Sequence, residues 1–178
     1  MSNPVVSGLK SVLGLRKEMS FGFYMRDFLF RRILRNNAKV KWAVHHTTTI
    51  HSPERITKGK GVYPGDSAGI YINARNGVIF GDYSNIAPNV GIISANHDFI
   101  NNDLHLPDPP IEIGRFVWVA MGAIILPGVK LGDFTTVGAG AIVTKSFPEG
   151  YCVIAGNPAK IIKYLNKEEC DAFAKSKS

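Results

Sequence analysis

Aliphatic side chains recur at every sixth residue over the stretch 113–148. The first positions of the successive hexads are Ile113, Val119, Ile125, Leu131, Val137 and Val143. A small residue directly follows most of them, namely Gly114, Ala120, Gly132 and Gly138. This period fits neither the 3.6 residues of a helical turn nor the two-residue alternation of an isolated strand. It predicts a solenoid in which each hexad supplies one short strand and one corner, and three hexads close a triangular coil.

The repeat extends backward to residue 44, although less regularly. On the same spacing its earlier first positions are Val44, Ile50, Ile56, Val62, Ala68, Ala74, Phe80, Ile86 and Ile92. The hexads over 44–97 predict three coils, and those over 113–148 predict two more. We therefore expect an all-β solenoid of about five coils within residues 42–156.

The period breaks over residues 98–112. This stretch, DFINNDLHLPDPPIE, holds three prolines, and its length is not a multiple of six. It predicts a loop that leaves the solenoid wall. Long loops on rigid scaffolds commonly carry function, so the residues where this loop leaves are the first candidates for chemistry. The alternative is a loop that only covers one face of the solenoid.

The ends of the chain are predicted to be helical, with a basic aromatic extension over 1–41 and a helical tail over 157–178. Residues 1–41 hold nine Lys or Arg and two acidic residues, a net charge of 9 − 2 = +7, which equals the formal net charge of the whole chain. A helix is expected from about 19 to 36. Its apolar residues are Phe21, Phe23, Tyr24, Met25, Phe28, Leu29, Phe30, Ile33 and Leu34.

Three partners are conceivable for this basic helix. Its aromatic face could pack on the solenoid or on a sister subunit, or it could lie on an anionic membrane surface as a peripheral contact. Nucleic acid is disfavoured as a partner, because no recognition motif accompanies the charge.

The composition indicates a single domain of 178 residues in a reducing compartment. The two cysteines, Cys152 and Cys170, form neither a disulfide framework nor a metal knuckle. No apolar run approaches the roughly 20 residues of a membrane span, and the start lacks the apolar segment of a secretion signal. We expect a cytoplasmic location, with peripheral contact at the inner membrane surface as an option.

Three stretches together resemble a known family. They are IFGDYSNIAPNVGIISANHDF, IEIGRFVWVAMGAIILPGVKLGDFTTVGAGAIVTK and VIAGNPAKIIK. They are similar to the hexapeptide-repeat, left-handed β-helix acyltransferases, and among these to the sugar and exopolysaccharide O-acetyltransferases related to maltose and galactoside acetyltransferases. The resemblance covers about residues 60–165. It implies a left-handed parallel β-helix, a homotrimer, and acetyl-CoA bound in a groove between adjacent solenoids.

The resemblance also implies the catalytic residues. His97 matches the family's general base, and an imidazole suits this task because it titrates near neutral pH. Met121 matches the residue whose main-chain N–H stabilises the oxyanion of the tetrahedral intermediate, with Ala120 beside it. Asn96 and Asp98 flank the base and could orient it or the acceptor sugar. The alternative for both is a turn residue that caps its own backbone.

Cofactor contacts follow the same comparison. Trp118 matches an aromatic near the cofactor arm, with a wall residue at the trimer interface as the alternative. Further candidates are Ala120, Met121, Gly138, Ala139, Gly140, Thr144 and Lys145. Small residues let the pantetheine arm approach the backbone closely. Either Lys160 or Lys163 could bind the phosphates of CoA. The alternative is that both lysines belong to a solvated C-terminal helix.

The expected function is acetyl-CoA-dependent O-acetylation of a sugar hydroxyl, with a lipid-linked saccharide as one conceivable acceptor. N-acetylation of an amino-sugar nucleotide is an alternative, since an attacking amine needs the same proton removal. A non-catalytic trimeric scaffold is the second alternative. No metal is expected: a γ-class carbonic anhydrase shares the scaffold, but residues 113–178 contain no histidine to complete its zinc site.

Overall fold

The computed structural model describes residues 15–16 and 18–177, which form two compact units divided after residue 38. In the first unit, helix α2 (Phe21–Asp27) continues directly into the π-helix η1 (Phe28–Ile33). Ser20 caps α2, because its hydroxyl accepts a hydrogen bond from the N–H of Phe23 at 3.1 Å. The helix predicted over about 19–36 is confirmed, while the part of the extension over 1–14 lies outside the described residues. No helix among the described residues combines the length and the apolarity needed to cross a membrane.

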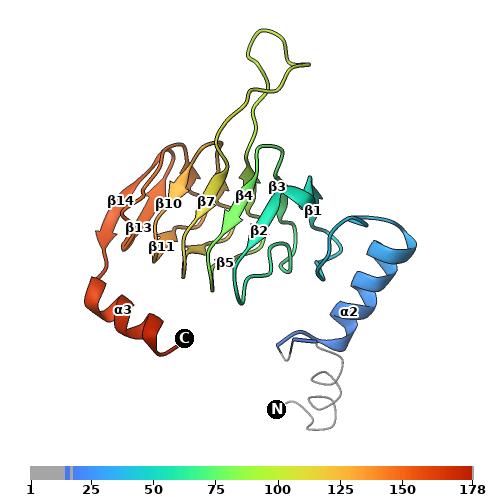
Figure 1. Ribbon diagram of the computed structural model, residues 1–178, viewed down its shortest axis with the longest axis horizontal. Helices are drawn as coiled ribbons and strands as arrows, with labels where there is room; N and C mark the ends of the chain where they lie inside the picture. Colours follow the sequence, from blue (N-terminus) through green and yellow to red (C-terminus); the bar gives the residue numbers. More distant parts are fainter. Residues whose placement is uncertain (1–14, 17, 178) are drawn as a thin grey trace. The chain divides into compact units, whose positions relative to one another are not determined.

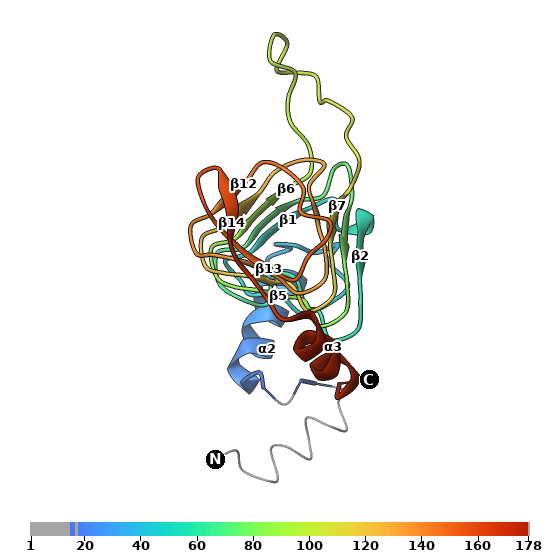
Figure 2. The same cartoon turned by 90° about the vertical axis from the view of Figure 1, so that its left-hand side faces the viewer.

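The second unit is a three-sided parallel β-helix, seen end-on in Figure 2. Sheet A contains β1 (Thr49–His51), β3 (Tyr71–Asn73), β6 (Gly91–Ile93), β9 (Ile124–Ile125) and β12 (Ile142–Val143). Sheet B contains β2 (Ile56–Lys58), β4 (Val78–Phe80), β7 (Ile111–Ile113) and β10 (Lys130–Leu131). Sheet C contains β5 (Asn85–Ile86), β8 (Trp118–Val119), β11 (Thr135–Val137), β13 (Cys152–Gly156) and β14 (Ala159–Tyr164).

The strand register confirms the hexapeptide period in the later coils. Ile124 pairs with Ile142, which lies three hexads further along the chain, so three hexads complete one turn. Across the predicted loop, Ile92 pairs with Ile125. The separation of these two residues along the chain equals three hexads plus the whole length of the stretch 98–112. The irregular stretch itself lies between β6 and β7, at 94–110, and extends away from the prism in Figure 1.

The first coils depart from the predicted register. Ile50 pairs with Ile72, and Ile72 pairs with Ile92, so these two steps exceed three hexads by four positions and by two. The prediction that Ala68 is an inward-facing first position is therefore wrong, because Ala68 is exposed and Ile70 is buried in its stead. In the first step the extra residues lie in the short 3-10 helix η2 (Pro53–Arg55) and in the turns of 59–70, where the first coil has no strand in sheet C. In the second step they lie in the turn at 74–77, between β3 and β4.

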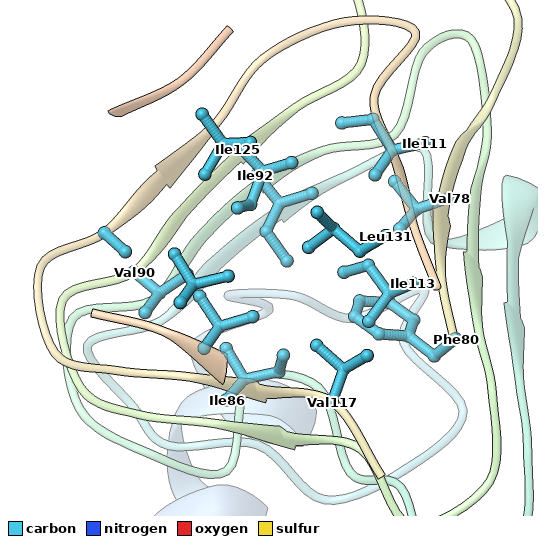
Figure 3. Close-up of a cluster of buried hydrophobic side chains, with 14 of the residues drawn as sticks. Val78, Phe80, Ile86, Val90, Ile92, Ile111, Ile113, Val117, Ile125 and Leu131 are labelled. Atoms are coloured by element: carbon cyan, nitrogen blue, oxygen red, sulfur yellow. The ribbon is translucent and has the colours of Figure 1, made fainter. Parts of the chain in front are cut away.

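The interior of the prism is filled by aliphatic side chains, as Figure 3 shows. Ile72, Ile92 and Ile125 stack in successive coils of sheet A, and each is fully buried. Each such side chain contributes roughly 1.5–3 kcal/mol of burial free energy. Because side chains occupy this interior, a ligand must bind on the outside of the prism.

Four aromatic rings stack along the corner between sheets B and C. Tyr83, Phe116, Phe134 and Tyr151 have centroid separations of 5.2, 4.8 and 5.6 Å in that order. All four have positive φ, between 49° and 57°, which is rare for residues other than glycine. We call these four residues the aromatic ladder.

The chain ends in an antiparallel hairpin and a short helix. Strand β14 pairs with β13, and helix α3 covers only Lys167–Lys175. The predicted helical tail over 157–178 is therefore wrong for residues 159–164. The extended conformation lets β14 bond along the open edge of sheet C, which a helix would leave unpaired. Helix α3 packs on the aromatic ladder, where the Tyr151 hydroxyl donates to Asp171 at 2.8 Å.

Candidate active site

The predicted site residues lie at two different corners of the prism. The C–A corner, where the chain passes from sheet C to sheet A, carries Ala120, Met121, Gly138, Ala139 and Gly140, with Trp118 on the strand leading into it. The A–B corner carries Asn96, His97, Asp98, Thr144 and Lys145. Sheet A separates these corners within one chain. A single chain therefore does not bring His97 and Met121 together.

His97 lies at the base of a two-stranded arm formed by the loop. His97 and His105 face each other as an antiparallel bridge. On either side of them, the N–H of Asp98 donates to the carbonyl of Leu104, and the N–H of Leu106 donates to the carbonyl of Asn96, both at 2.9 Å. The loop thus leaves the prism as a paired arm, and this pairing fixes the backbone of the candidate base.

A main-chain carbonyl orients the imidazole of His97. The ring nitrogen Nδ1 contacts the carbonyl oxygen of Asn102. A carbonyl can only accept a hydrogen bond, so Nδ1 carries the proton and donates it. In the neutral ring Nε2 then holds the free lone pair. Because His97 is exposed, this lone pair is accessible to an incoming hydroxyl.

A second histidine lies against the first. The rings of His97 and His105 have centroids 4.2 Å apart. Burial lowers the pKa of His105 below its usual value near 6.5, and the positive charges of Arg75 and of protonated His97 act in the same direction. His105 is consequently neutral at neutral pH and adds no positive charge beside the candidate base.

Asp98 serves the turn of the loop. Its Oδ1 accepts hydrogen bonds from the N–H groups of Ile100 and Asn101 at 2.9 and 2.8 Å, and these bonds lower the pKa of its carboxyl group. Asp98 therefore caps the backbone of its own turn, which is the alternative given for it in place of orienting the base. The partner that orients His97 is the carbonyl of Asn102. The sequence does not reveal it, because a main-chain acceptor in a loop without a period leaves no sequence signal. Asn96 is half-buried at the start of the arm.

The C–A corner presents an open edge of backbone. Among the described residues, none accepts a hydrogen bond from the main-chain N–H of Met121 or of Ala139. Beside them, a methyl group added to Gly140 would meet nothing within 4 Å, and one added to Gly122 would meet only the nitrogen of Gly140 at 4.0 Å. Two free donors thus lie on successive coils with open space next to them. This edge suits an elongated ligand that carries amide carbonyls.

Sheet C connects this corner to the candidate phosphate-binding residues. Its register places Trp118, Thr136, Val153 and Lys163 in one row. Trp118 is 50% exposed and lies three strands from Lys163, about 14 Å at the usual strand spacing. Lys160 pairs with Ala155, whose side chain lies against Gly138. Both lysines are exposed on strand β14 rather than on a helix, so either can reach a phosphate.

Thr144 and Lys145 lie on the corner of His97 and not on that of Trp118. Both are exposed, and the Nζ of Lys145 lies 5.7 Å from the centre of the Phe147 ring. A ligand along the C–A corner of the same chain cannot contact both Met121 and Lys145 without crossing sheet A. Their predicted cofactor role therefore depends on a neighbouring copy.

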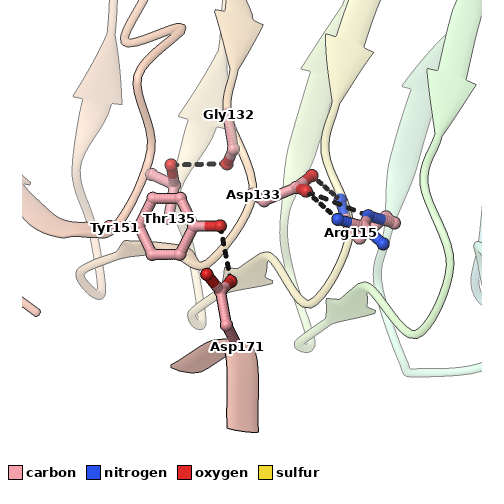
Figure 4. Close-up of polar contacts among 6 residues, drawn as sticks. All are labelled: Arg115, Gly132, Asp133, Thr135, Tyr151 and Asp171. Carbon is pink, nitrogen blue, oxygen red and sulfur yellow. Dashed lines mark hydrogen bonds and ion pairs between the residues drawn. The ribbon is translucent and has the colours of Figure 1, made fainter. Parts of the chain in front are cut away.

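A groove of about 500 Å³ lies at the third corner, along sheet B and the B–C corner. Arg115 forms a two-pronged ion pair with Asp133 there, with N–O distances of 2.9 and 2.7 Å, and Thr135 bonds the carbonyl of Gly132 (Figure 4). Lys130 pairs with Glu112 at 2.8 Å across the same surface. Four charged side chains of this groove are thus paired with one another, while Glu149 lines it as a further carboxylate. Among residues 15–16 and 18–177, no cluster of three His, Cys, Asp or Glu side chains could hold a metal ion.

Comparison with known proteins agrees with the repeat. The pattern of the bacterial transferase hexapeptide family, with six repeats, matches residues 110–145. The match covers about a fifth of the chain and includes strands β7 to β12. A Dictyostelium discoideum protein that carries the name of an acetyltransferase is 53% identical over 92 residues, 49% of this chain and 47% of its own length. The chain spans about half the length of the curated relatives it matches.

Two solved structures share the architecture. A galactoside acetyltransferase in complex with coenzyme A aligns with a TM-score of 0.66 and 24% identity, covering 92% of each chain. A maltose O-acetyltransferase from Clostridium difficile 630 aligns with a TM-score of 0.53 and 29% identity, covering 67% of this chain and 64% of that one. The left-handed parallel β-helix and the resemblance to the hexapeptide-repeat acetyltransferases are thus confirmed.

Proposed function

We propose that this protein is an acetyl-CoA-dependent O-acetyltransferase that acetylates a sugar hydroxyl, with His97 as the general base. The observation that carries the proposal is the orientation of the His97 ring. Its Nδ1 proton is bound by the Asn102 carbonyl, and Nε2 is left as a proton acceptor at the base of the loop arm. The relatives named as acetyltransferases support the same chemistry.

The C–A corner fits the pantetheine arm of acetyl-CoA. The galactoside acetyltransferase that shares this fold is described with coenzyme A. In this chain the free N–H group of Ala139 matches an amide carbonyl of the pantetheine arm, and the free N–H of Met121 is left for the thioester carbonyl. Gly122 and Gly140 leave room for close approach. Lys160 and Lys163 supply positive charge at the end of sheet C for the phosphates. Acetyl-CoA would supply an activated acetyl group as a thioester.

Each step of the transfer has a residue to perform it. His97 Nε2 accepts the proton of the attacking hydroxyl, so that the oxygen gains nucleophilicity as it bonds the acetyl carbon. The N–H of Met121 holds the carbonyl oxygen while negative charge develops on it. When the carbon–sulfur bond breaks, the imidazolium of His97 returns the proton to the departing sulfur. Atoms and protons balance, and no covalent enzyme intermediate is needed.

The two corners require two copies of the chain. Sheet A separates His97 from Met121 within one protomer, so the base and the oxyanion donor can meet only when the A–B corner of one copy faces the C–A corner of another. A cyclic homotrimer repeats this contact at three equivalent seams. Thr144 and Lys145 then approach the cofactor from the same side as His97.

Substitution of His97 tests the base. We expect His97→Ala to lower kcat/KM by roughly 10²- to 10⁴-fold, measured as release of free CoA during a screen of sugar acceptors. His51→Ala is the matched control, because His51 is also an exposed histidine but lies on strand β1 of sheet A, outside the candidate site. If His97→Ala is as active as the wild type, the base assignment is wrong and the scaffold alternative gains support.

Met121→Pro tests the oxyanion donor without changing the fold. Ile86 pairs with Val119, and Pro88 and Met121 each follow two residues later. Pro88 therefore occupies the same corner position one coil earlier, which shows that this position accommodates proline. Met121→Pro removes the N–H and is expected to lower kcat by about 10²- to 10³-fold, whereas Met121→Ala keeps the N–H and most of the activity. Equal activity of the two variants would contradict the role of the main chain.

The same assay separates hydroxyl from amine acceptors. His97 can deprotonate either, so the geometry of the base favours neither. We propose a hydroxyl as the acceptor rather than an amine, because the maltose O-acetyltransferase is 29% identical to this chain. CoA release with amino-sugar nucleotides but with no neutral sugar would move the assignment to N-acetylation.

A further inference from the structure

The helical segment over residues 21–33 has its charged pair buried. Arg31 donates from Nε and Nη2 to the carboxylate of Asp27, four residues earlier, at 2.8 and 2.6 Å. The two side chains are only 10% and 6% exposed, and Phe23 is buried on the same side of the helix. The ordinary arrangement of a helix in a water-soluble protein is the reverse, with apolar residues inside and charges outside.

The opposite side of this segment is apolar and exposed. Its large side chains are between 43% and 60% exposed, and they are Phe21, Met25, Phe28, Leu29, Ile33 and Leu34. The first four are spaced i, i+4, i+7 and i+8, which places them on one helix face. Contiguous apolar surface of this kind marks a site of interaction. We call these six residues the apolar face of the segment.

Positive charge accompanies the apolar face. Arg26, Arg32 and Arg35 are exposed on the same segment. The acidic residues described before residue 42 are Glu18, which lies 3.9 Å from Arg16, and the buried Asp27, so neither offsets these arginines. The segment therefore presents large apolar side chains and cations together, with its carboxylates already paired.

We propose that residues 21–35 bind an anionic phospholipid surface, with the apolar face at the boundary between headgroups and acyl chains and the arginines on lipid phosphates. Aromatic and aliphatic residues beside arginines suit this interface, because long basic side chains can extend to the phosphates while their stems stay apolar. A second copy would cover the apolar face but would bring the arginines of two chains together. A nucleic acid would pair with the arginines but leave the six apolar side chains in water.

Vesicle flotation of the full-length protein tests this proposal. We expect binding to vesicles of phosphatidylcholine with phosphatidylglycerol, weak binding to pure phosphatidylcholine, and loss of binding at high salt. Phe28→Asp and Ile33→Asp should each weaken binding about tenfold or more. Arg26→Gln with Arg32→Gln should weaken it by about fivefold per arginine.

Matched controls separate this segment from general surface effects. Lys58→Gln with Lys177→Gln removes the same amount of charge from exposed positions of the β-helix unit, and Ile79→Asp alters an apolar side chain that is exposed on sheet B. These variants should bind vesicles like the wild type.

Two results would overturn the proposal. One is that the protein binds neutral and anionic vesicles equally well, or that the variants of residues 21–35 bind vesicles as well as the control variants do. The other is a change of oligomeric state in Phe28→Asp with vesicle binding intact, which would assign the apolar face to a second copy. Vesicle binding requires no acetyl transfer, so its failure would leave the catalytic proposal untouched.

Discussion

At the scale of single residues, corner glycines determine how closely successive coils stack. A methyl group added to Gly132 would lie 2.2 Å from the carbonyl oxygen of Pro148 and 2.6 Å from the nitrogen of Gly150. Both are main-chain atoms, which cannot move away without shifting the next coil. For a methyl group on Gly91 the nearest atoms belong to the side chain of Ile124, at 3.5 Å and beyond, which is an ordinary contact. The two glycines therefore differ in the space around them.

We predict that Gly132→Ala lowers the free energy of unfolding by about 1–3 kcal/mol, because it overpacks the stacked corners. Gly91→Ala is the control and should change stability by less than about 0.5 kcal/mol. Thermal unfolding followed by circular dichroism measures both. Equal melting temperatures for the two variants would show that the coils are not in close contact at the B–C corner.

The environment of His105 makes a second prediction at this scale. Burial and the nearby charge of Arg75 disfavour its protonated form, so its imidazole should titrate below the usual pKa near 6.5. Replacing Arg75 with Gln removes one positive charge and should raise the pKa of His105. An NMR titration of the histidine ring protons measures this. A downward shift, or none, would contradict the placement of Arg75 beside the arm.

Sequence could identify His97, because the loop begins beside it and the family resemblance supplies its role. It could not supply the Asn102 carbonyl, since any residue type provides a main-chain acceptor and the loop has no period to align. Asp98 was a candidate for orienting the base. The structure shows instead that two N–H groups of its own turn occupy its carboxylate.

At the scale of elements, the six-residue period predicts the later coils well. Their regular steps follow directly from three hexads, and the loop adds its own length to one step. The same period fails over 44–77, because η2 and the turns of 59–70 lengthen the first step by four positions and the turn at 74–77 lengthens the second by two. Strand β14 was missed because its main-chain bonds come from β13, a partner that local sequence does not reveal.

The aromatic ladder does have a sequence signal that follows the coils. Glycine stands two residues before an aromatic at Gly81-Asp82-Tyr83, Gly114-Arg115-Phe116 and Gly132-Asp133-Phe134. The last two are separated by one coil of three hexads. Their common positive φ shows that this is a recurring corner, and Phe173 of α3 packs edge-on against Phe116 at 5.8 Å.

Docking of α3 should depend on pH at the alkaline end. The hydrogen bond to Asp171 is the main cause that raises the pKa of Tyr151 above its usual value near 10, and burial adds to it. A raised pKa in the folded state means that docking is fully stabilised below pH 10 and weakens as pH rises through the folded value. Amide exchange of α3 should therefore accelerate at high pH beyond the intrinsic rate. Tyr151→Phe should remove this dependence, and its persistence would refute the contact.

At the scale of the whole molecule, one chain holds both halves of a candidate active site but keeps them apart. His97 stands at the A–B corner, and Met121 with the open backbone edge stands at the C–A corner. The interior is packed with aliphatic side chains, so the site must lie outside the prism. The sequence indicated a site between copies only through the family resemblance, because the spacing of the hexads carries no information on contacts between copies.

Oligomers that mix two inactive variants test whether His97 and Met121 meet between copies. His97→Ala and Met121→Pro are each expected to be nearly inactive alone. The two variants are then co-expressed and purified as mixed oligomers. With random assembly, about a quarter of the contacts between copies combine an intact His97 from one copy with an intact Met121 from the next. We expect the mixed oligomers to recover about a quarter of the wild-type CoA release per site. Mixed oligomers that stay as inactive as their parents would show that both residues act within one chain, or that they do not share a site.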